Sequence, residues 1–376
     1  MDFSLNEEQQ MLADLVARFV ERQCDFETRR ASAASARGWS EDNWTALAET
    51  GLLALCLDEQ YGGLGAGAEE MLLVMEAFGR GLVLEPYLAS ALVGAPLLQR
   101  VGSAQHKEHL LPVLASGEIR ISLAALEPQS RYDLCDVSCS ARETQEGFRL
   151  VGRKSVVSHG DSADWLIVSA RTCGAQTDRH GISLFLIDAN SPGVSVRSFA
   201  GLDGQRVAEV QLDGVNVARD ALLGPMHEAI EDLEWAVDRA CFALCAEAVG
   251  CMDRLIELTV EYLQTRKQFG KPIGSFQALQ HRIAEMLGLS EQARSITYYA
   301  AANLNGEQDD RARAVSAAKT LIGRAGRLIG QHATQLHGGM GMTDELAAGW
   351  FFKRLTVIDM SWGDGDHYVE RYGALM

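Results

Sequence analysis

The stretch Tyr262-Leu-Gln-Thr-Arg-Lys-Gln-Phe-Gly-Lys-Pro-Ile-Gly274 lies between two runs in which apolar residues recur at helical spacing. The sequence therefore predicts a helix, a tight corner rich in Gly and Pro, and a second helix. The corner places Arg266, Gln268 and Phe269 within four residues. A guanidinium group pairs well with pyrophosphate and an aromatic ring stacks on flat groups, so the corner suits a planar ligand that carries phosphate. A capped helix corner with a solvated arginine is the alternative that these residues alone leave open.

The periodicity of the apolar residues changes twice along the chain. It is helical up to about Gly117 and changes to period two over about 119–223, where short apolar runs are bounded by Gly, Asp, Asn or Pro. Several short strands without intervening helices predict a small antiparallel barrel or sandwich. Helical spacing then returns in long runs. The sequence predicts an α+β protein with a helical domain at 1–118, a β domain at 119–226 and a helical domain at 227–376, whose helices lie near 228–265, 275–303 and 309–337 and after Thr343.

Length, charge and cysteine content exclude several classes of protein. The chain has 376 residues, 47% of them hydrophobic, which is enough for two or three packed domains. Its apolar runs are far shorter than the roughly 20 residues of a membrane-spanning helix, and its acidic N-terminus is unlike a signal peptide. The eight cysteines lack zinc-site spacing, and a formal net charge of −17 disfavours nucleic acid and anionic membranes. We expect a soluble, cytoplasmic protein with reduced thiols, no metal site, no nucleic-acid partner and no membrane insertion.

Three motifs, in order, resemble the acyl-CoA dehydrogenase family. The corner contains the family's Arg-x-x-Phe-Gly signature, Tyr61–Gly65 resembles its N-terminal glycine turn, and Gln335–Gly341 resembles its C-terminal flavin-contacting turn. The resemblance runs to about residue 370 and implies an N-terminal helical domain, a middle antiparallel β-barrel and a C-terminal four-helix bundle. The sequence of Cys245–Gly250 is most similar to that of small subunits of pimeloyl-CoA dehydrogenase-type enzymes.

The resemblance implies that FAD binds between the β domain and the C-terminal helices, where a neighbouring subunit completes the site. The signature would meet its pyrophosphate and adenine side, and the C-terminal turn would approach the FAD of the adjacent subunit. Glycines are useful there because the backbone must come close to the ligand. The residues assigned in this way are Arg266, Gln268, Phe269, Gln335, Gly338 and Gly339.

Two segments of the β domain depart from the family's pattern. Ser158 takes the position of a threonine that hydrogen-bonds the flavin ring, whereas Val156 replaces the tryptophan that covers the ring. In the loop near the thioester, Arg131 and Tyr132 replace a small Gly-Ser pair. Arg131 would bind either the far carboxylate of a dicarboxylic substrate or a phosphate of coenzyme A. A surface loop with changed residues is the alternative.

The resemblance implies an acyl-CoA substrate, and removal of its α-proton needs a carboxylate within hydrogen-bond reach in a dry site. Trp362 occupies the position of the family's usual C-terminal glutamate and cannot be a base. Some members carry the glutamate just before an arginine, early in the helix before the signature. Counting back without a gap places these positions on Ala240 and Cys241, whereas a two-residue slip places them on Asp238, the candidate base, and Arg239, a candidate substrate-binding residue. A solvated carboxylate at the start of the helix is the alternative for Asp238. Glu247 lies deeper on the same helix and is a second candidate, either as base or as a buried group near the substrate tail.

Two functions of different classes follow. The chain is a working FAD-dependent acyl-CoA dehydrogenase with a relocated base, or it is a partner subunit that supplies flavin contacts while another chain brings the base. The resemblance implies a homo- or heterotetramer and electron-transfer flavoprotein as the electron acceptor. An acyl-CoA oxidase or flavin monooxygenase on the same scaffold would differ in rapid reaction of the reduced flavin with oxygen.

Overall fold

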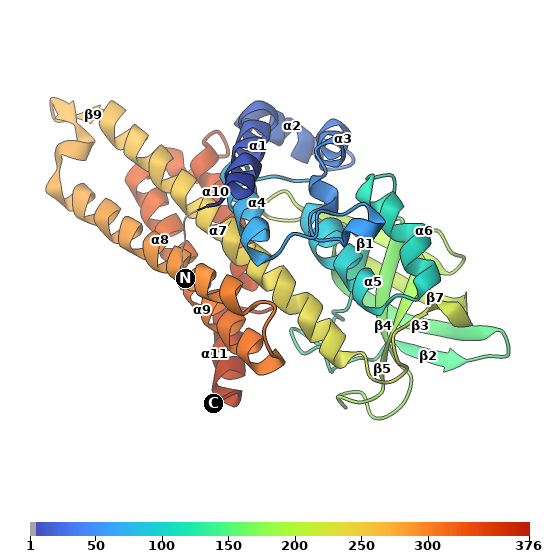
Figure 1. The fold of residues 1–376 in the computed structure, drawn as a ribbon. Coiled ribbons are helices and arrows are strands. Elements are labelled where there is room, and N and C mark those ends of the chain that lie inside the picture. The colour runs from blue at the N-terminus through green and yellow to red at the C-terminus, as the bar shows by residue number, and fades with distance from the viewer. Residues whose placement is uncertain (1–4) are drawn as a thin grey trace. The chain divides into compact units, whose positions relative to one another are not determined.

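The computed structural model describes residues 5–376, which divide into two compact units (Figure 1). The first unit comprises Met1–Ala31, Ala68–Val83 and Cys241–Met376, and the second comprises Ser32–Gly67 and Leu84–Ala240. Helix α7 (Ile230–Thr265) passes without a break from one unit to the other. The predicted division at 1–118, 119–226 and 227–376 does not coincide with these units and stays a prediction.

Helices build the first unit, and two glycines let two of them pack backbone to backbone. A Cβ on Gly79 would stand 1.9 Å from the Glu247 carbonyl oxygen, and one on Gly250 would stand 1.8 Å from that of Glu76. Only glycine permits this approach between α4 and α7. The helices of this unit are α1 (Glu7–Gln23), most of α2 (Phe26–Ala34), α4 (Ala68–Gly81), α7 from Cys241 on, α8 (Gln277–Asn303), α9 (Gln308–His337), α10 (Ala347–Met360) and α11 (Gly365–Ala374).

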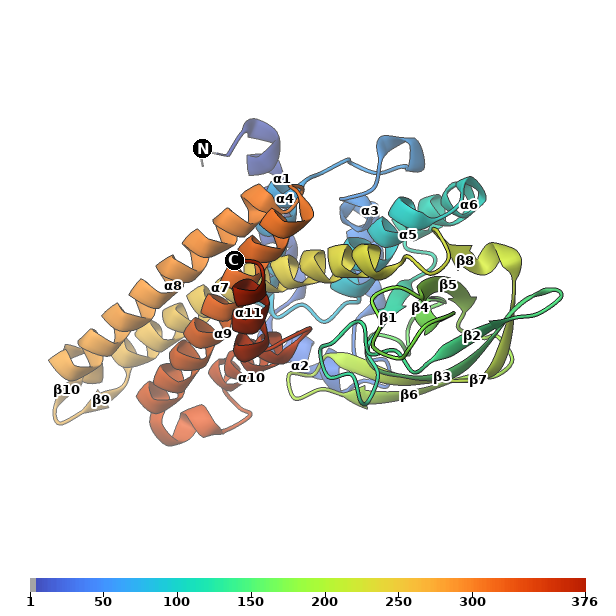
Figure 2. The ribbon, with the colours of Figure 1, turned by 90° about the horizontal axis from the view of Figure 1, so that it is seen from below.

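The predicted corner is a short hairpin, β9 (Lys267–Gln268) and β10 (Lys271–Pro272), followed by a 3-10 turn at Ile273–Ser275. It joins α7 to α8, which return side by side (Figure 2). The shorter C-terminal helix that the sequence predicts after Thr343 is two helices, because Trp362 and Gly363 have positive φ values of 58° and 134°. Asp364 then caps α11 by accepting a hydrogen bond from the His367 amide at 3.0 Å.

An eight-stranded sheet forms the centre of the second unit. Its strand pairings run in the order β6-β7-β3-β2-β4-β5-β8, with β1 beside β4. The strands are β1 (Ile121–Ala124), β2 (Ser140–Glu143), β3 (Gly147–Ser158), β4 (Trp165–Arg171), β5 (Ile182–Asp188), β6 (Val194–Ala200), β7 (Arg206–Ala218) and β8 (Leu222–Leu223). Strands β4 and β5 are almost entirely buried. The unit also contains α3 (Glu41–Glu49), a π-helical turn at Leu88–Gly94, α5 (Ala95–Val101) and α6 (Ala104–Ala115).

The sheet is mixed rather than purely antiparallel, which corrects one detail of the prediction. Strand β1 pairs with β4 in parallel, and β2 adds one parallel pair with β4. Parallel neighbours need a long connection, and the segment between β1 and β4 provides it by containing β2 and β3. The α+β class is confirmed. Among residues 5–376 no helix is both long and apolar enough to cross a membrane.

Candidate functional site

A cavity of about 700 Å³ in the first unit brings together five of the predicted cofactor residues. Arg266 and Gln268 come from the end of α7 and the hairpin, while Gln335, Gly338 and Gly339 come from the end of α9. Residues from the first half of the hairpin and from a helix end about 70 positions later therefore line one cavity. The remaining lining residues are Tyr262, Ile273, Ala278, Leu279, Arg282, Leu336, His337 and Met340.

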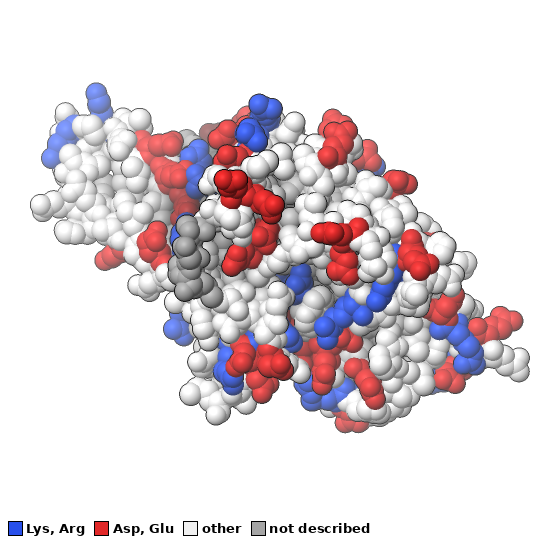
Figure 3. Space-filling view, in the orientation of Figure 1, with Lys and Arg blue, Asp and Glu red and all other residues white. Residues whose placement is uncertain are grey.

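The walls of this cavity are cationic in a strongly acidic protein. Residues 262–284 and 311–343 contain no Asp or Glu, although the chain has 51 acidic and 34 basic residues. Figure 3 shows basic side chains at the tip that carries β9 in Figure 1. Neither Arg266 nor Arg282 has a carboxylate partner within residues 5–376. Both charges are therefore available to an anionic ligand.

The far wall of the cavity fits a ligand that contacts backbone. Gly338 has φ of 60°, a conformation that disfavours side chains, and a Cβ on Gly338 or Gly339 would meet no atom within 4 Å. His337 stacks against Tyr262 with ring centroids 4.6 Å apart. Burial lowers the pKa of His337, although its hydrogen bond to the Ala333 carbonyl acts in the opposite direction, so its ring is neutral at pH 7. Open backbone, two amides and two guanidinium groups match the phosphates and edges of a dinucleotide such as FAD.

Phe269 lies outside this cavity. It is 90% exposed at the hairpin tip with a positive φ of 52°, and its ring meets Phe276 edge-on at 6.1 Å. A strained backbone that presents a bare aromatic ring is typical of a residue that contacts something outside the chain. Its assigned role toward adenine stays a prediction.

A fully buried ion pair in the second unit fixes the loop that the family resemblance implies to lie near the thioester. The Lys154 ammonium donates to Glu127 Oε1 at 2.7 Å, to the Ala125 carbonyl at 3.2 Å and to Ser169 Oγ at 2.9 Å. Glu127 also accepts bonds from the Ser138 amide at 2.9 Å and hydroxyl at 2.5 Å. Burial alone would raise the pKa of Glu127, but the Lys154 ammonium and these donors outweigh it and lower the pKa below its ordinary value.

This network holds the loop by both of its ends, while its middle faces solvent. Arg131 is exposed with φ of 48° and has no carboxylate partner in residues 5–376. Its charge is free to meet an anionic substrate. That role stays a prediction.

Ser158 and Val156 lie beside a β-bulge in β3. The pairing of β3 with β7 shifts by one residue between Lys154 and Val157, so one extra residue bends the strand. The Ser155 amide leaves the ladder and donates to the Leu126 carbonyl at 2.8 Å. Val156 has φ of 53° and is 61% exposed, while Ser158 is half-buried and its hydroxyl makes no hydrogen bond in the described chain. The bulge thus turns both side chains toward a position where a ligand can reach them.

Two candidates for chemistry lie on the first part of α7 in the second unit. Asp238 is 0% exposed, and Arg239 is 7% exposed with its guanidinium 4.9 Å from the centre of the Trp235 ring. Burial lowers the pKa of Arg239, against the effect of nearby Cys56. Both side chains are packed within this chain.

Glu247, on α7 in the first unit, forms a bidentate ion pair with Arg354 of α10. Arg354 Nε and Nη2 donate to the two carboxylate oxygens of Glu247, each at 2.6 Å. The side chains are 5% and 8% exposed. A carboxylate whose two oxygens are both held by guanidinium is a poor proton acceptor, so this geometry favours the structural role of Glu247.

The turn that contains Trp362 is fully formed. Buried Lys319 of α9 donates to the carbonyls of Ile358 at 2.6 Å and Ser361 at 2.9 Å, which end α10. Tyr368 donates its hydroxyl to the Trp362 carbonyl at 2.9 Å. The turn is therefore well ordered, and it carries an indole rather than a carboxylate at position 362.

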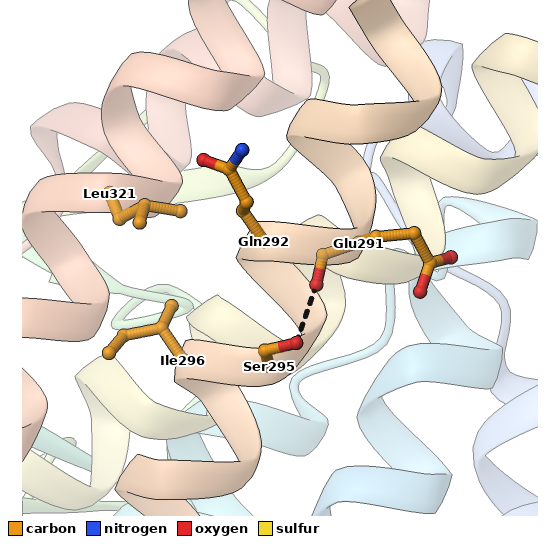
Figure 4. A pocket seen from close by; sticks show the side chains of 5 residues that line it. All are labelled: Glu291, Gln292, Ser295, Ile296 and Leu321. Atoms are coloured by element: carbon orange, nitrogen blue, oxygen red, sulfur yellow. Dashed lines mark hydrogen bonds between the residues drawn. The ribbon is translucent and has the colours of Figure 1, made fainter. Parts of the chain in front are cut away.

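A second cavity, of about 410 Å³, lies where α8 faces α9 (Figure 4). Its lining is Glu291, Gln292, Ser295, Ile296 and Leu321, and the Glu291 carboxylate points away from the two apolar side chains. Ser295 bonds the Glu291 carbonyl within the helix at 2.8 Å. This lining contains no cation that would bind phosphate.

Comparison with known proteins agrees with the fold. The chain matches the acyl-CoA dehydrogenase N-terminal domain over residues 6–118, the middle domain over 122–215 and the C-terminal domain over 231–371. The chain belongs to the acyl-CoA dehydrogenase family, whose members are FAD-dependent oxidoreductases.

Three relatives cover nearly the whole chain. Acyl-CoA dehydrogenase FadE27 of Mycobacterium tuberculosis is 28% identical over 99% of this chain and 98% of its own length. The solved structure of a variant of the Tcur3481-Tcur3483 steroid ACAD is 30% identical, with a TM-score of 0.89 over 99% of this chain and 98% of that chain. The ChsE4-ChsE5 complex from Mycobacterium tuberculosis is 27% identical, with a TM-score of 0.90 over 100% of this chain and 98% of that chain.

Sequence reasoning missed Arg282, Lys154 and Lys319 as residues of the site and its supports. Arg282 could have been found, because it lies in an acid-free run that begins at the signature. Lys154 reads as an ordinary residue of a strand, and only the bulge that follows it shows why it points inward.

Proposed function

We propose that this chain is an FAD-binding subunit of an enzyme that desaturates acyl-CoA thioesters, with electron-transfer flavoprotein as acceptor. The cavity formed by Arg266, Gln268, Gln335 and Gly338 carries the proposal, because its cations, amides and open backbone suit a dinucleotide. When bound, FAD accepts the hydride that leaves the β-carbon of the substrate.

The chain's own groups would bind FAD, orient its ring and deprotonate the acyl-CoA substrate. The cavity of the first unit would hold the pyrophosphate and adenine half of FAD, and the Ser158 hydroxyl would orient a ring. Asp238, whose side chain is 0% exposed, would take the α-proton on a carboxylate oxygen. Arg131 would meet an anionic part of the thioester.

The cavity belongs to the first unit and Asp238 to the second. The family resemblance implies that a neighbouring subunit completes each FAD site. We infer a homo- or heterotetramer in which each FAD meets two chains.

A second candidate function is favoured by Trp362. Lys319 caps the end of the helix before Trp362, but position 362 carries no carboxylate. Both carboxylate oxygens of Glu247 are bound by Arg354. The chain would then serve as a non-catalytic partner in a heterotetramer, in which another acyl-CoA dehydrogenase-like subunit supplies the base. Its similarity to a chain of the ChsE4-ChsE5 complex supports this arrangement.

Bleaching of the flavin by acyl-CoA thioesters, followed anaerobically, separates these functions. If Asp238 is the base, Asp238→Asn keeps FAD bound but abolishes bleaching, while Glu231→Gln, an exposed acid on the same helix, bleaches like the wild type. Bleaching of the wild type only after a second dehydrogenase-like subunit is added would establish the partner role. Equal bleaching by Asp238→Asn and the wild type would eliminate Asp238, and a wild type that never retains FAD would contradict both functions.

A further inference from the structure

Two guanidinium groups line the same cavity, but only one belongs to the signature. Arg266 directly follows α7, whereas Arg282 lies on α8 beyond the corner. No carboxylate lies within ion-pair distance of either group in residues 5–376, and none of the residues that line the cavity is acidic. In a chain with a formal net charge of −17, two uncompensated arginines at one cavity indicate a ligand with at least two negative charges.

A histidine holds Arg282 without neutralising it. Arg282 Nη1 lies 3.0 Å from His332 Nδ1, and because arginine can only donate, that nitrogen accepts the hydrogen bond. The other ring nitrogen of His332 is 3.9 Å from Glu285 Oε2. The side chain of His332 is 23% exposed, so the histidine is partly packed and limits the directions that the guanidinium can take. Arg282 keeps its full charge for a ligand.

We propose that Arg282 is a second phosphate-binding residue of this cavity, acting with Arg266 on the two phosphates of a diphosphate, and that His332 positions it. The inference rests on the proposed FAD site and extends it by a residue outside the family signature. One guanidinium from each side of the corner gives each phosphate a planar donor, which a single arginine cannot do. Gln268 and Gln335 remain for the sugar or base edges.

The test uses the full chain in the oligomer in which it purifies, freed of cofactor, and measures dissociation constants for FAD, ADP and riboflavin by fluorescence titration. The variants are Arg282→Gln, Arg282→Lys, Arg266→Gln and, as a matched control, Arg324→Gln, an exposed arginine of α9 outside the cavity. Circular dichroism checks that each variant is folded. We expect Arg282→Gln to fold normally, because the Arg282 side chain is exposed on α8. We expect Arg282→Gln to raise the dissociation constants for FAD and ADP by roughly tenfold to a hundredfold, and that for riboflavin by less than twofold. Arg282→Lys keeps the charge but not the planar donors and should be intermediate.

Each outcome decides the question. If Arg282→Gln binds FAD and ADP as tightly as Arg324→Gln while Arg266→Gln is weakened, Arg282 has no part in phosphate binding and the proposed function survives. Equal weakening for riboflavin and ADP would show a general disturbance of the cavity and also overturn the inference. A wild-type protein that binds neither FAD nor ADP would overturn the proposed function together with it.

Discussion

Lys154→Met removes the cation from the buried pair that fixes the Leu126–Cys139 loop. Both Lys154 and Glu127 are 0% exposed at the side chain, so the variant leaves an uncompensated carboxylate inside the protein. Breaking a buried pair in this way costs about 3–5 kcal/mol. An unfolding entropy of about 2.1 cal/mol/K per residue gives roughly 0.8 kcal/mol/K for 376 residues, so the expected loss in melting temperature is about 4–6 °C.

The assay is thermal unfolding followed by far-ultraviolet circular dichroism at pH 7. Glu127→Gln/Lys154→Met should recover at least about half of the loss, because no unpaired charge remains. The control is Arg197→Met, which breaks a pair with Glu209 whose arginine is 69% exposed and should shift the melting temperature by about 1 °C or less. A melting temperature of Lys154→Met within about 1 °C of the wild type, or a double variant no better than the single one, would refute the assigned cost of the unpaired carboxylate.

Two further predictions concern buried carboxylates. Arg354→Met strands Glu247 and should lower the melting temperature by about 4–6 °C on the same reasoning, with Arg354→Lys recovering only part because an ammonium group cannot reproduce the bidentate contact; full recovery by lysine would contradict this. The pKa of Glu127 is lowered in the folded protein, so its contribution to stability is complete above its ordinary pKa of about 4.5 and is lost as the pH falls through the folded value. The melting temperatures of wild type and Glu127→Gln, measured between pH 7 and 3.5, should therefore converge as the pH falls. A constant difference would show that Glu127 does not titrate as described.

The helices, the corner and the α+β class could be predicted because they depend on local signals. Periodicity defined α8 and α9, and the glycines and proline between 270 and 274 required the corner. That Arg266, Gln268 and Gln335 belong to one group also followed from motifs, and they share a cavity. The site as a whole stays a prediction.

What the sequence could not supply depends on contacts between distant segments. The ion pair between Glu247 and Arg354 joins positions 107 residues apart, and no local sequence pattern predicts that these two side chains meet. The parallel pairing of β1 with β4 likewise depends on how the chain returns after β3. The resemblance predicts that Trp362 replaces the family's glutamate, whereas the bonds from Lys319 that cap the end of α10 are visible only in three dimensions.

The two segments without Asp or Glu, 262–284 and 311–343, also influence how a charged cofactor approaches from solution. At long range the molecule presents a net charge of −17 and repels a dianion. At physiological ionic strength a charge is felt over only about 8 Å, so attraction begins when the diphosphate is almost in contact with the walls of the cavity. Loading should consequently be slow and faster in moderate salt, while release, governed by short-range contacts with the guanidinium groups, should be slow throughout.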